Sequence, residues 1–116
     1  FRSDSTDGGR TWCTAYDTGL PNNNSGIDLV RTADGKILLA CNPRENYPGM
    51  YSGSRTPLSL LISGDNGETF EHLADLETEE GIFCYPSIIC NERREVLMTY
   101  TWNRRTIVFC RFEYED

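Results

Sequence analysis

Short segments in which apolar residues alternate with polar ones constrain this chain more than any other feature of its sequence. They are rich in β-branched and aromatic residues and lie at 27–30, 36–40, 58–62, 86–90, 95–100 and 106–110. A period of two places successive side chains on opposite faces of a strand, whereas a helix needs a period near 3.6. Asp34-Gly35 adds a hairpin signal, because both positions of a two-residue turn require positive φ. The sequence therefore predicts an all-β fold.

The charge and the hydropathy of the chain argue against two classes of partner, nucleic acids and membranes. Eighteen acidic residues against eleven basic ones leave a formal net charge of -7. Such a chain repels a polyanion at long range, so we do not expect nucleic acid as its partner. No run approaches the roughly 18 apolar residues of a membrane span, so we expect no membrane insertion. Residues 1–4 lack the pattern of a signal peptide, which leaves the compartment open between cytoplasm and export with a leader outside this sequence.

The cysteines do not form a metal-binding pattern. Cys13, Cys41, Cys84, Cys90 and Cys110 contain no CxxC pair, and the chain has one His. Zinc sites need closely spaced Cys and His ligands, so we expect no metal, and nothing in the sequence indicates another cofactor. Four of the five cysteines lie in apolar segments, where Cys acts as a small buried hydrophobic residue.

Two glycine-rich turns share the pattern Ser-x-Asp-x-Gly-x-Thr-aromatic, at residues 5–12 and 63–70. We call them the first and second repeat turns. In such a turn the Ser and Asp side chains accept hydrogen bonds from backbone N–H groups, and Gly takes the left-handed conformation. The pattern predicts a structural role for its members, which are Ser5, Asp7, Gly9, Thr11, Trp12, Ser63, Asp65, Gly67, Thr69 and Phe70.

The repeat turns resemble the Asp boxes of the sialidase (neuraminidase) superfamily, which join the third and fourth strands of β-propeller blades. Segments 20–28, 55–60, 85–89 and 99–105 are also similar to the last blades of BNR-repeat sialidases of bacteria and plants. The resemblance implies a partial six-bladed propeller with antiparallel four-stranded blades. Residues 1–16 then end one blade, 27–75 form a complete blade, and 84–113 form three strands of the last blade.

Blade topology sorts the loops onto two faces. The loop that enters the first strand and the loop between the second and third strands lie on one face, opposite the Asp boxes. This grouping brings together 22–26, 41–55, 77–85 and 101–105. The 42–55 loop is longer than a hairpin requires, which favours a function over mere connection. We expect the ligand at this face.

Arg55 and Tyr85 occupy positions that carry chemistry in the sialidases. The resemblance implies that Arg55 belongs to the arginine triad that grips the sugar carboxylate, and that Tyr85 is the catalytic nucleophile. A planar guanidinium matches a carboxylate bidentately. A neutral phenol does not repel an anionic substrate, but its ordinary pKa near 10 makes it depend on a neighbouring base. In the alternative interpretation, Arg55 is a solvated loop residue and Tyr85 packs under the blade.

The remaining sialidase residues are not visible in this sequence. In the family, two further arginines, the acid/base Asp and the Glu that activates the Tyr lie upstream of the segment that begins here with Phe1. The final-blade position that reads Tyr-Glu in many sialidases is Tyr100-Thr101. We therefore expect the isolated chain to be inactive, because a catalytic unit fails when members are missing.

Other residues on the same loops are candidates for binding the substrate. They offer cations, a carboxylate partner, an amide for sugar hydroxyls and aromatic platforms; the set is Arg44, Asp28, Asn24, Tyr51, Trp102 and Arg104. Each also has a structural interpretation. Exposed turns carry cations, Asn tolerates left-handed backbone, and Asp caps turns.

Three functions remain open from the sequence. The first is a sialidase-like glycoside hydrolase acting on sialic acid or another anionic sugar, and the second is a lyase acting on uronic acids. The third is a non-catalytic module that binds carbohydrate or assembles into a ring. In each case the expected partner is an acidic glycan or sialoside. The open edges of the blades also predict self-association, unless upstream blades cover them.

Overall fold

The structure, a computed structural model, describes residues 1–114 and is built from strands. Its elements are β1 (Asp28–Arg31), β2 (Ile37–Cys41), β3 (Leu58–Ser63), β4 (Glu71–Glu77), β5 (Phe83–Cys90), β6 (Glu95–Trp102) and β7 (Thr106–Glu113). No helix appears between residues 1 and 114, so the all-β prediction is confirmed. Accordingly, this part of the chain has no helix that could cross a membrane.

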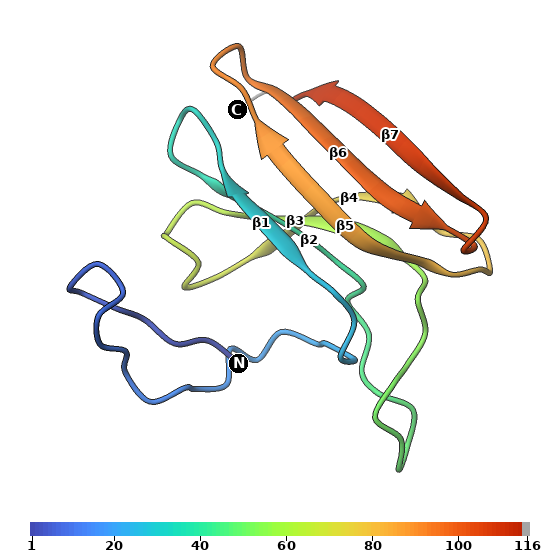
Figure 1. Cartoon of the computed structure of the whole chain (residues 1–116), viewed down its shortest axis with the longest axis horizontal. Coiled ribbons are helices and arrows are strands. Elements are labelled where there is room, and N and C mark those ends of the chain that lie inside the picture. The colour runs from blue at the N-terminus through green and yellow to red at the C-terminus, as the bar shows by residue number, and fades with distance from the viewer. Residues whose placement is uncertain (115–116) are drawn as a thin grey trace.

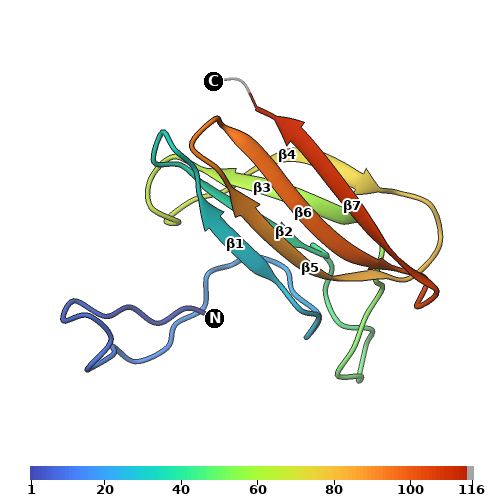
Figure 2. The same cartoon turned by 45° about the horizontal axis from the view of Figure 1, so that its top comes forward.

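The strands form two antiparallel sheets that follow one another along the chain. The first sheet has the order β1-β2-β3-β4, and the second has the order β5-β6-β7. Every strand pairs with its neighbour in sequence, so each sheet is a simple meander. The two sheets meet along their first strands, β1 and β5, which lie side by side in both views (Figures 1 and 2).

Apolar side chains from both sheets form one core between them. Because side chains alternate along a strand, β2 directs Leu38 and Ala40 to this inner face, and β6 directs Val96, Met98 and Tyr100 to it. All five are buried. Burial of a Leu or Met side chain stabilises a fold by about 1.5–3 kcal/mol, so this layer is the main attraction between the sheets.

Polar contacts beside the core tie the two sheets together. Asp28 Oδ2 accepts a hydrogen bond from the Ile88 N–H at 2.9 Å, and Asn42 Nδ2 donates to the Phe83 carbonyl at 2.9 Å. Because β5 is an edge strand, these contacts satisfy backbone groups that the sheet itself leaves without partners. The Asp28 carboxylate therefore acts as a link between β1 and β5.

Replacing Asp28 with Ala removes the acceptor for the Ile88 N–H at the junction of the sheets. We expect the free energy of unfolding to fall by about 1–3 kcal/mol, the range for leaving a partly buried donor unsatisfied. Chemical denaturation measures this change. Glu92→Ala, at an exposed turn position, is the matched control and should leave the stability nearly unchanged. Equal effects of the two substitutions would contradict the linking role of Asp28.

The two repeat turns have the same hydrogen-bond network. In the first, the Ser5 hydroxyl accepts from the Gly9 N–H at 2.9 Å, and Asp7 Oδ1 accepts from the Thr11 N–H at 2.9 Å. In the second, Ser63 accepts from Gly67 at 2.8 Å, and Asp65 accepts from Thr69 at 2.9 Å. Gly9 and Gly67 both have positive φ, at 87° and 80°. The repeated sequence therefore encodes a repeated local structure.

Both turn carboxylates are stabilised in their charged form. The Thr11 hydroxyl and N–H lower the pKa of Asp7 to about 2, and the Thr69 hydroxyl and N–H lower the pKa of Asp65 to about 2. A carboxylate whose pKa is lower in the folded chain than in the unfolded chain stabilises the fold above its unfolded pKa. That stabilisation disappears as the pH falls through the folded pKa.

The melting temperature should therefore fall as the pH decreases from the ordinary Asp pKa of 3.8 towards about 2. In Asp65→Asn the fall should be smaller, because one of the two carboxylates that protonate in this window is absent. Thermal unfolding at a series of pH values tests this. Glu68→Gln is the control, since it removes a negative charge from the second repeat turn without removing one of the turn's side-chain hydrogen bonds.

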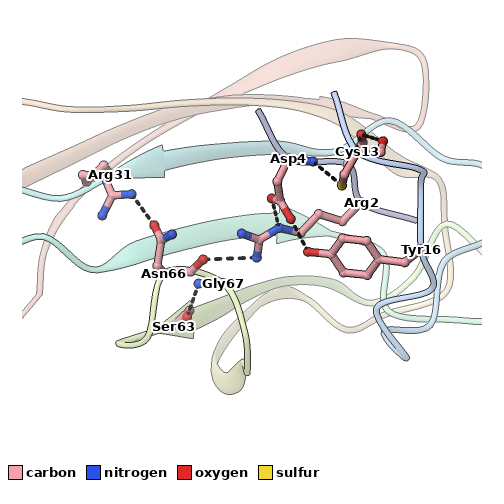
Figure 3. Close-up of polar contacts among 9 residues, drawn as sticks. Arg2, Asp4, Cys13, Tyr16, Arg31, Ser63, Asn66 and Gly67 are labelled. Atoms are coloured by element: carbon pink, nitrogen blue, oxygen red, sulfur yellow. Dashed lines mark hydrogen bonds and ion pairs between the residues drawn. The ribbon is translucent and has the colours of Figure 1, made fainter. Parts of the chain in front are cut away.

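The N-terminal segment before β1 is held by side chains rather than by a sheet. An isolated bridge pairs Arg2 with Tyr16, and Asp4 accepts from Arg2 Nε at 2.7 Å and from the Tyr16 hydroxyl at 2.6 Å (Figure 3). Arg2 Nη1 also donates to the Asn66 carbonyl at 3.1 Å, and Arg31 Nη2 donates to Asn66 Oδ1 at 2.7 Å. The second repeat turn thus anchors this segment to the first sheet.

Candidate functional site

Three loops converge where the chain enters β1, β3 and β5. The Phe83 N–H donates to the Arg55 carbonyl at 3.0 Å, which joins the entries of β3 and β5. Asn23 Nδ2 donates to the Ser54 carbonyl at 2.6 Å, and Asn24 Nδ2 donates to the Tyr51 carbonyl at 2.8 Å. The loops are therefore connected by one backbone hydrogen bond and by two Asn side chains that donate to backbone carbonyls. The second repeat turn follows β3, so it lies at the far end of that strand.

Arg55 lies half-buried in this loop cluster and is held by neutral oxygens. Its Nη1 donates to Asn23 Oδ1 at 3.0 Å, to the Gly53 carbonyl at 3.2 Å and to the Asn23 carbonyl at 3.4 Å. Among residues 1–114, no carboxylate pairs with Arg55, and its Nε and Nη2 make no hydrogen bond. Nε–H and Nη2–H point in the same direction, so the guanidinium retains one bidentate edge for an anion.

Asn23 is the residue that orients Arg55. Its side chain is fully buried, and its Oδ1 accepts from both Arg55 Nη1 and the Ser25 hydroxyl, the latter at 2.7 Å. A buried side chain cannot reach a sugar hydroxyl, so Asn23 supports the site from behind. The sequence offers three consecutive Asn residues with no signal that distinguishes the buried one.

Tyr85 stands exposed in a strained backbone conformation. It has φ of 53°, lies where the β5–β6 register shifts between Cys84 and Ser87, and is 68% exposed. Positive φ is unusual for a bulky residue and costs of order 1–3 kcal/mol, so the surrounding structure must impose it. The ring packs on Gly26, where an added Cβ would lie only 3.2 Å from Tyr85 Cδ1. Gly26 thus permits the close approach that connects Tyr85 to the loop of Asn23.

The other predicted site residues lie at varying distances from this cluster. Arg44 is exposed and near Asp75 in β4, whose pKa is lowered first by His72, then by Ser59, with a smaller effect of the Arg44 charge. Trp102 is half-buried against the core, with its ring centroid 6.5 Å from that of Phe83. We therefore leave both residues out of the site.

Asn24, Tyr51 and Arg104 remain on the loops themselves. Asn24 has φ of 60° and ties its loop to the exposed Tyr51. Arg104 is exposed in the β6–β7 turn, next to Asn103, whose Oδ1 accepts from the Ile82 N–H at 2.8 Å. That contact joins the turn to the segment that leads into β5. Asp28 lies at the sheet junction, where its carboxylate accepts a hydrogen bond from the Ile88 N–H.

Within residues 1–114, the cysteines and acidic residues form no metal site. In the described residues, no group of three or more His, Cys, Asp or Glu side chains is placed to hold a metal ion. All five cysteines are free thiols, and burial raises the pKa of Cys41 to about 11. Such a thiol stays protonated and unreactive at neutral pH. The cluster around Arg55 and Tyr85 is thus the strongest candidate site.

Comparison with known protein families identifies the family of this chain. A family model described as a BNR repeat-like domain matches residues 1–98. The chain belongs to this family. The match confirms the resemblance to the sialidase/BNR-repeat superfamily, and it spans both repeat turns as well as Arg55 and Tyr85. It indicates a sialidase-like or related family that acts on glycans. No curated protein and no solved structure matched the chain.

Replacing Asn23 with Ala should loosen the loop cluster. The substitution removes the side-chain partner of the Ser54 carbonyl and of the Ser25 hydroxyl, and it leaves Arg55 Nη1 with backbone carbonyls alone. We expect a loss of about 1–3 kcal/mol in the free energy of unfolding, measured by denaturant titration. Ser52→Ala in the same cluster removes a side chain without a hydrogen bond in the described structure and is the control. A stability equal to that of the control would show that Asn23 does not organise the cluster.

Proposed function

We propose that this chain is part of a sialidase-like glycoside hydrolase that acts on sialic acid or another anionic sugar. In this proposal Arg55 clamps the sugar carboxylate, and Tyr85 is the nucleophile. The observation that carries the proposal is the bidentate edge of Arg55, which is oriented by Asn23 and free of any carboxylate among residues 1–114. A half-buried cation with no internal counter-charge favours an anionic ligand.

The chemistry of the ligand follows from the guanidinium. Nε–H and Nη2–H form two parallel donors, and a carboxylate has two coplanar acceptors at the same spacing. Because Nη1 is already held by carbonyl and amide oxygens, the guanidinium loses little rotational freedom on binding. Sialic acids and uronic acids both present such a carboxylate beside sugar hydroxyls.

Tyr85 supports the proposal through its exposure and its backbone strain. Strained residues cluster at functional sites, where the surrounding structure holds a side chain in position for its task. Among the described residues, no side chain hydrogen-bonds the Tyr85 hydroxyl, so residues 1–114 supply no base that would activate it. The isolated chain is therefore expected to bind an anionic sugar without cleaving it, and catalysis depends on a base from outside these residues.

The two sheets support the corresponding architecture. We propose that the four-stranded sheet is a complete propeller blade and that the three-stranded sheet begins the next blade of a six-bladed ring. The two sheets meet along β1 and β5, the strands that lie nearest the axis in a propeller. The repeat turns are the Asp boxes in this proposal.

A non-catalytic carbohydrate-binding role is the second candidate. It is favoured by the absence of a base at the Tyr85 hydroxyl within residues 1–114. A uronic-acid lyase is the third, because a tyrosine beside a neutralised carboxylate can also abstract a proton. Only the lyase yields an unsaturated product that absorbs ultraviolet light.

Titration calorimetry with N-acetylneuraminic acid tests the clamp, and the methyl ester of the same sugar is the matched neutral ligand. We expect the acid to bind and the ester to bind much more weakly. Arg55→Lys should weaken binding of the acid by about ten- to a hundredfold, because the charge remains but the fork is lost. Arg93→Lys, at an exposed position in the β5–β6 turn and outside the loop cluster, is the control variant. Galacturonic acid in a parallel titration separates uronic from sialic acids.

Equal affinities for the acid and the ester, or an Arg55→Lys variant that binds as tightly as the unsubstituted chain, would disprove the carboxylate clamp. Release of a fluorogenic aglycone from a sialoside by this chain alone, abolished by Tyr85→Phe, would contradict the expectation that it binds without cleaving.

A further inference from the structure

The outer face of the second sheet, which points away from the first sheet, carries large exposed apolar side chains beside the exposed Arg111 and Glu113 of β7. Ile89, Ile107 and Phe109 are 58%, 72% and 64% exposed. They alternate with the core residues of β5 and β7, so they share the outer face with Leu97 and Thr99 of β6. Side chains of this size gathered on one exposed face mark an interaction surface.

The outer face of the first sheet is also incompletely covered. Ile27 and Leu29 are 52% and 54% exposed, and they line a hollow of about 700 Å³ together with Ile37, Leu39 and Cys41. Leu20 and Phe70 cover the neighbouring part of this face. Because Ile37, Leu39 and Cys41 are themselves buried, the exposed part of this face lies at Ile27 and along β1. On its inner face the first sheet uses the same strand, β1, to meet β5.

The pairing registers allow the two sheets to be aligned residue by residue, starting from their first hairpins. In this alignment, the residues on the outer face of each sheet correspond to those on the inner face of the other. Arg31 pairs with Ile37 at the end of the first hairpin, and Cys90 pairs with Val96 at the end of the corresponding hairpin in the second sheet. Position 37 of the first sheet thus corresponds to position 96 of the second. Each later residue of β2 corresponds in the same way to the residue of β6 at the same distance from its hairpin. Ala40 pairs with Leu60 as Thr99 pairs with Phe109.

With this correspondence, the outer face of the second sheet matches the inner face of the first. The matched positions are Val30 with Ile89, Leu38 with Leu97, Ala40 with Thr99, and Leu60 with Phe109. The outer face of the first sheet likewise matches the inner face of the second, through Leu29 with Ile88, Leu39 with Met98, and Leu61 with Cys110. The two inner faces already pack together in the core.

We infer that a second copy of this chain covers these faces. The outer face of the β5–β6–β7 sheet of one copy packs on the outer face of the β1–β2–β3–β4 sheet of the next, with its β5 along the hollow beside β1. The N-terminal segment contributes to the contact, because Phe1 is exposed at the rim of the hollow. Since the two surfaces differ, the association is head-to-tail, and it forms either a closed ring or an open chain of copies.

Analytical ultracentrifugation over a concentration series tests this inference with two single-face variants. Leu29→Asp blocks only the first-sheet face, and Phe109→Asp blocks only the second-sheet face. The unsubstituted chain should associate, and each variant alone should associate at least about tenfold more weakly. An equimolar mixture should form a species of two chains, because each variant contributes the intact face that the other lacks.

Met50→Asp is the matched control, since Met50 is 55% exposed in the 42–55 loop and belongs to neither face. It should associate like the unsubstituted chain. Circular dichroism verifies that each variant is folded, and Ile107→Asp replaces Phe109→Asp if that variant unfolds. A monomer at every concentration would overturn the inference. So would a mixture that stays monomeric, or self-association of Leu29→Asp at full strength, which would indicate that the second-sheet face pairs with itself.

Discussion

The packing of two sheets through their inner faces is the interaction on which the rest of this molecule depends. Neither a four-stranded nor a three-stranded meander buries both of its faces alone. The layer that contains Leu38, Ala40, Val96 and Met98 removes one face of each sheet from water. The Asp28 carboxylate fixes how the two sheets are aligned, because it accepts a hydrogen bond from one particular N–H group, that of Ile88, on the edge of β5.

The candidate site is a consequence of this junction. With β1 and β5 side by side, the loops that enter β1, β3 and β5 must meet at one end of the strands. Their polar backbone groups then need partners, and the buried Asn23 provides several of them. The same contacts hold one side of the Arg55 guanidinium and leave its other edge open. The residue that positions the site is therefore also one that stabilises the loop cluster.

Residues whose partners are close in the sequence could be predicted, whereas residues buried by distant segments could not. Ser63, Asp65 and Thr69 form the network that their spacing predicts, because every partner lies within a few positions of the others along the chain. Asn23 could not be distinguished from its neighbours Asn22 and Asn24, because only the loop around Ser54, far along the chain, buries it. The sequence offers Trp102 as an aromatic platform, and it could not show that the ring is half-buried beside Phe83, its partner across the β5–β6 pair.

By itself, the sequence determined the features that depend on short-range interactions. The period-two alternation sets the strands, the repeat turns set their own local structure, and the net charge of -7 sets the character of the surface. Asp34-Gly35 marks a hairpin as predicted, but the turn is not the expected two-residue one: it spans residues 33–35, and of Asp34 and Gly35 only Gly35 has positive φ. Tertiary structure alone decided the rest. It determined which strands meet, which face stays uncovered, that Asp28 links two sheets, and that Tyr85 is strained and exposed on Gly26. These properties arise from contacts between residues far apart in the chain, and no local pattern encodes such contacts.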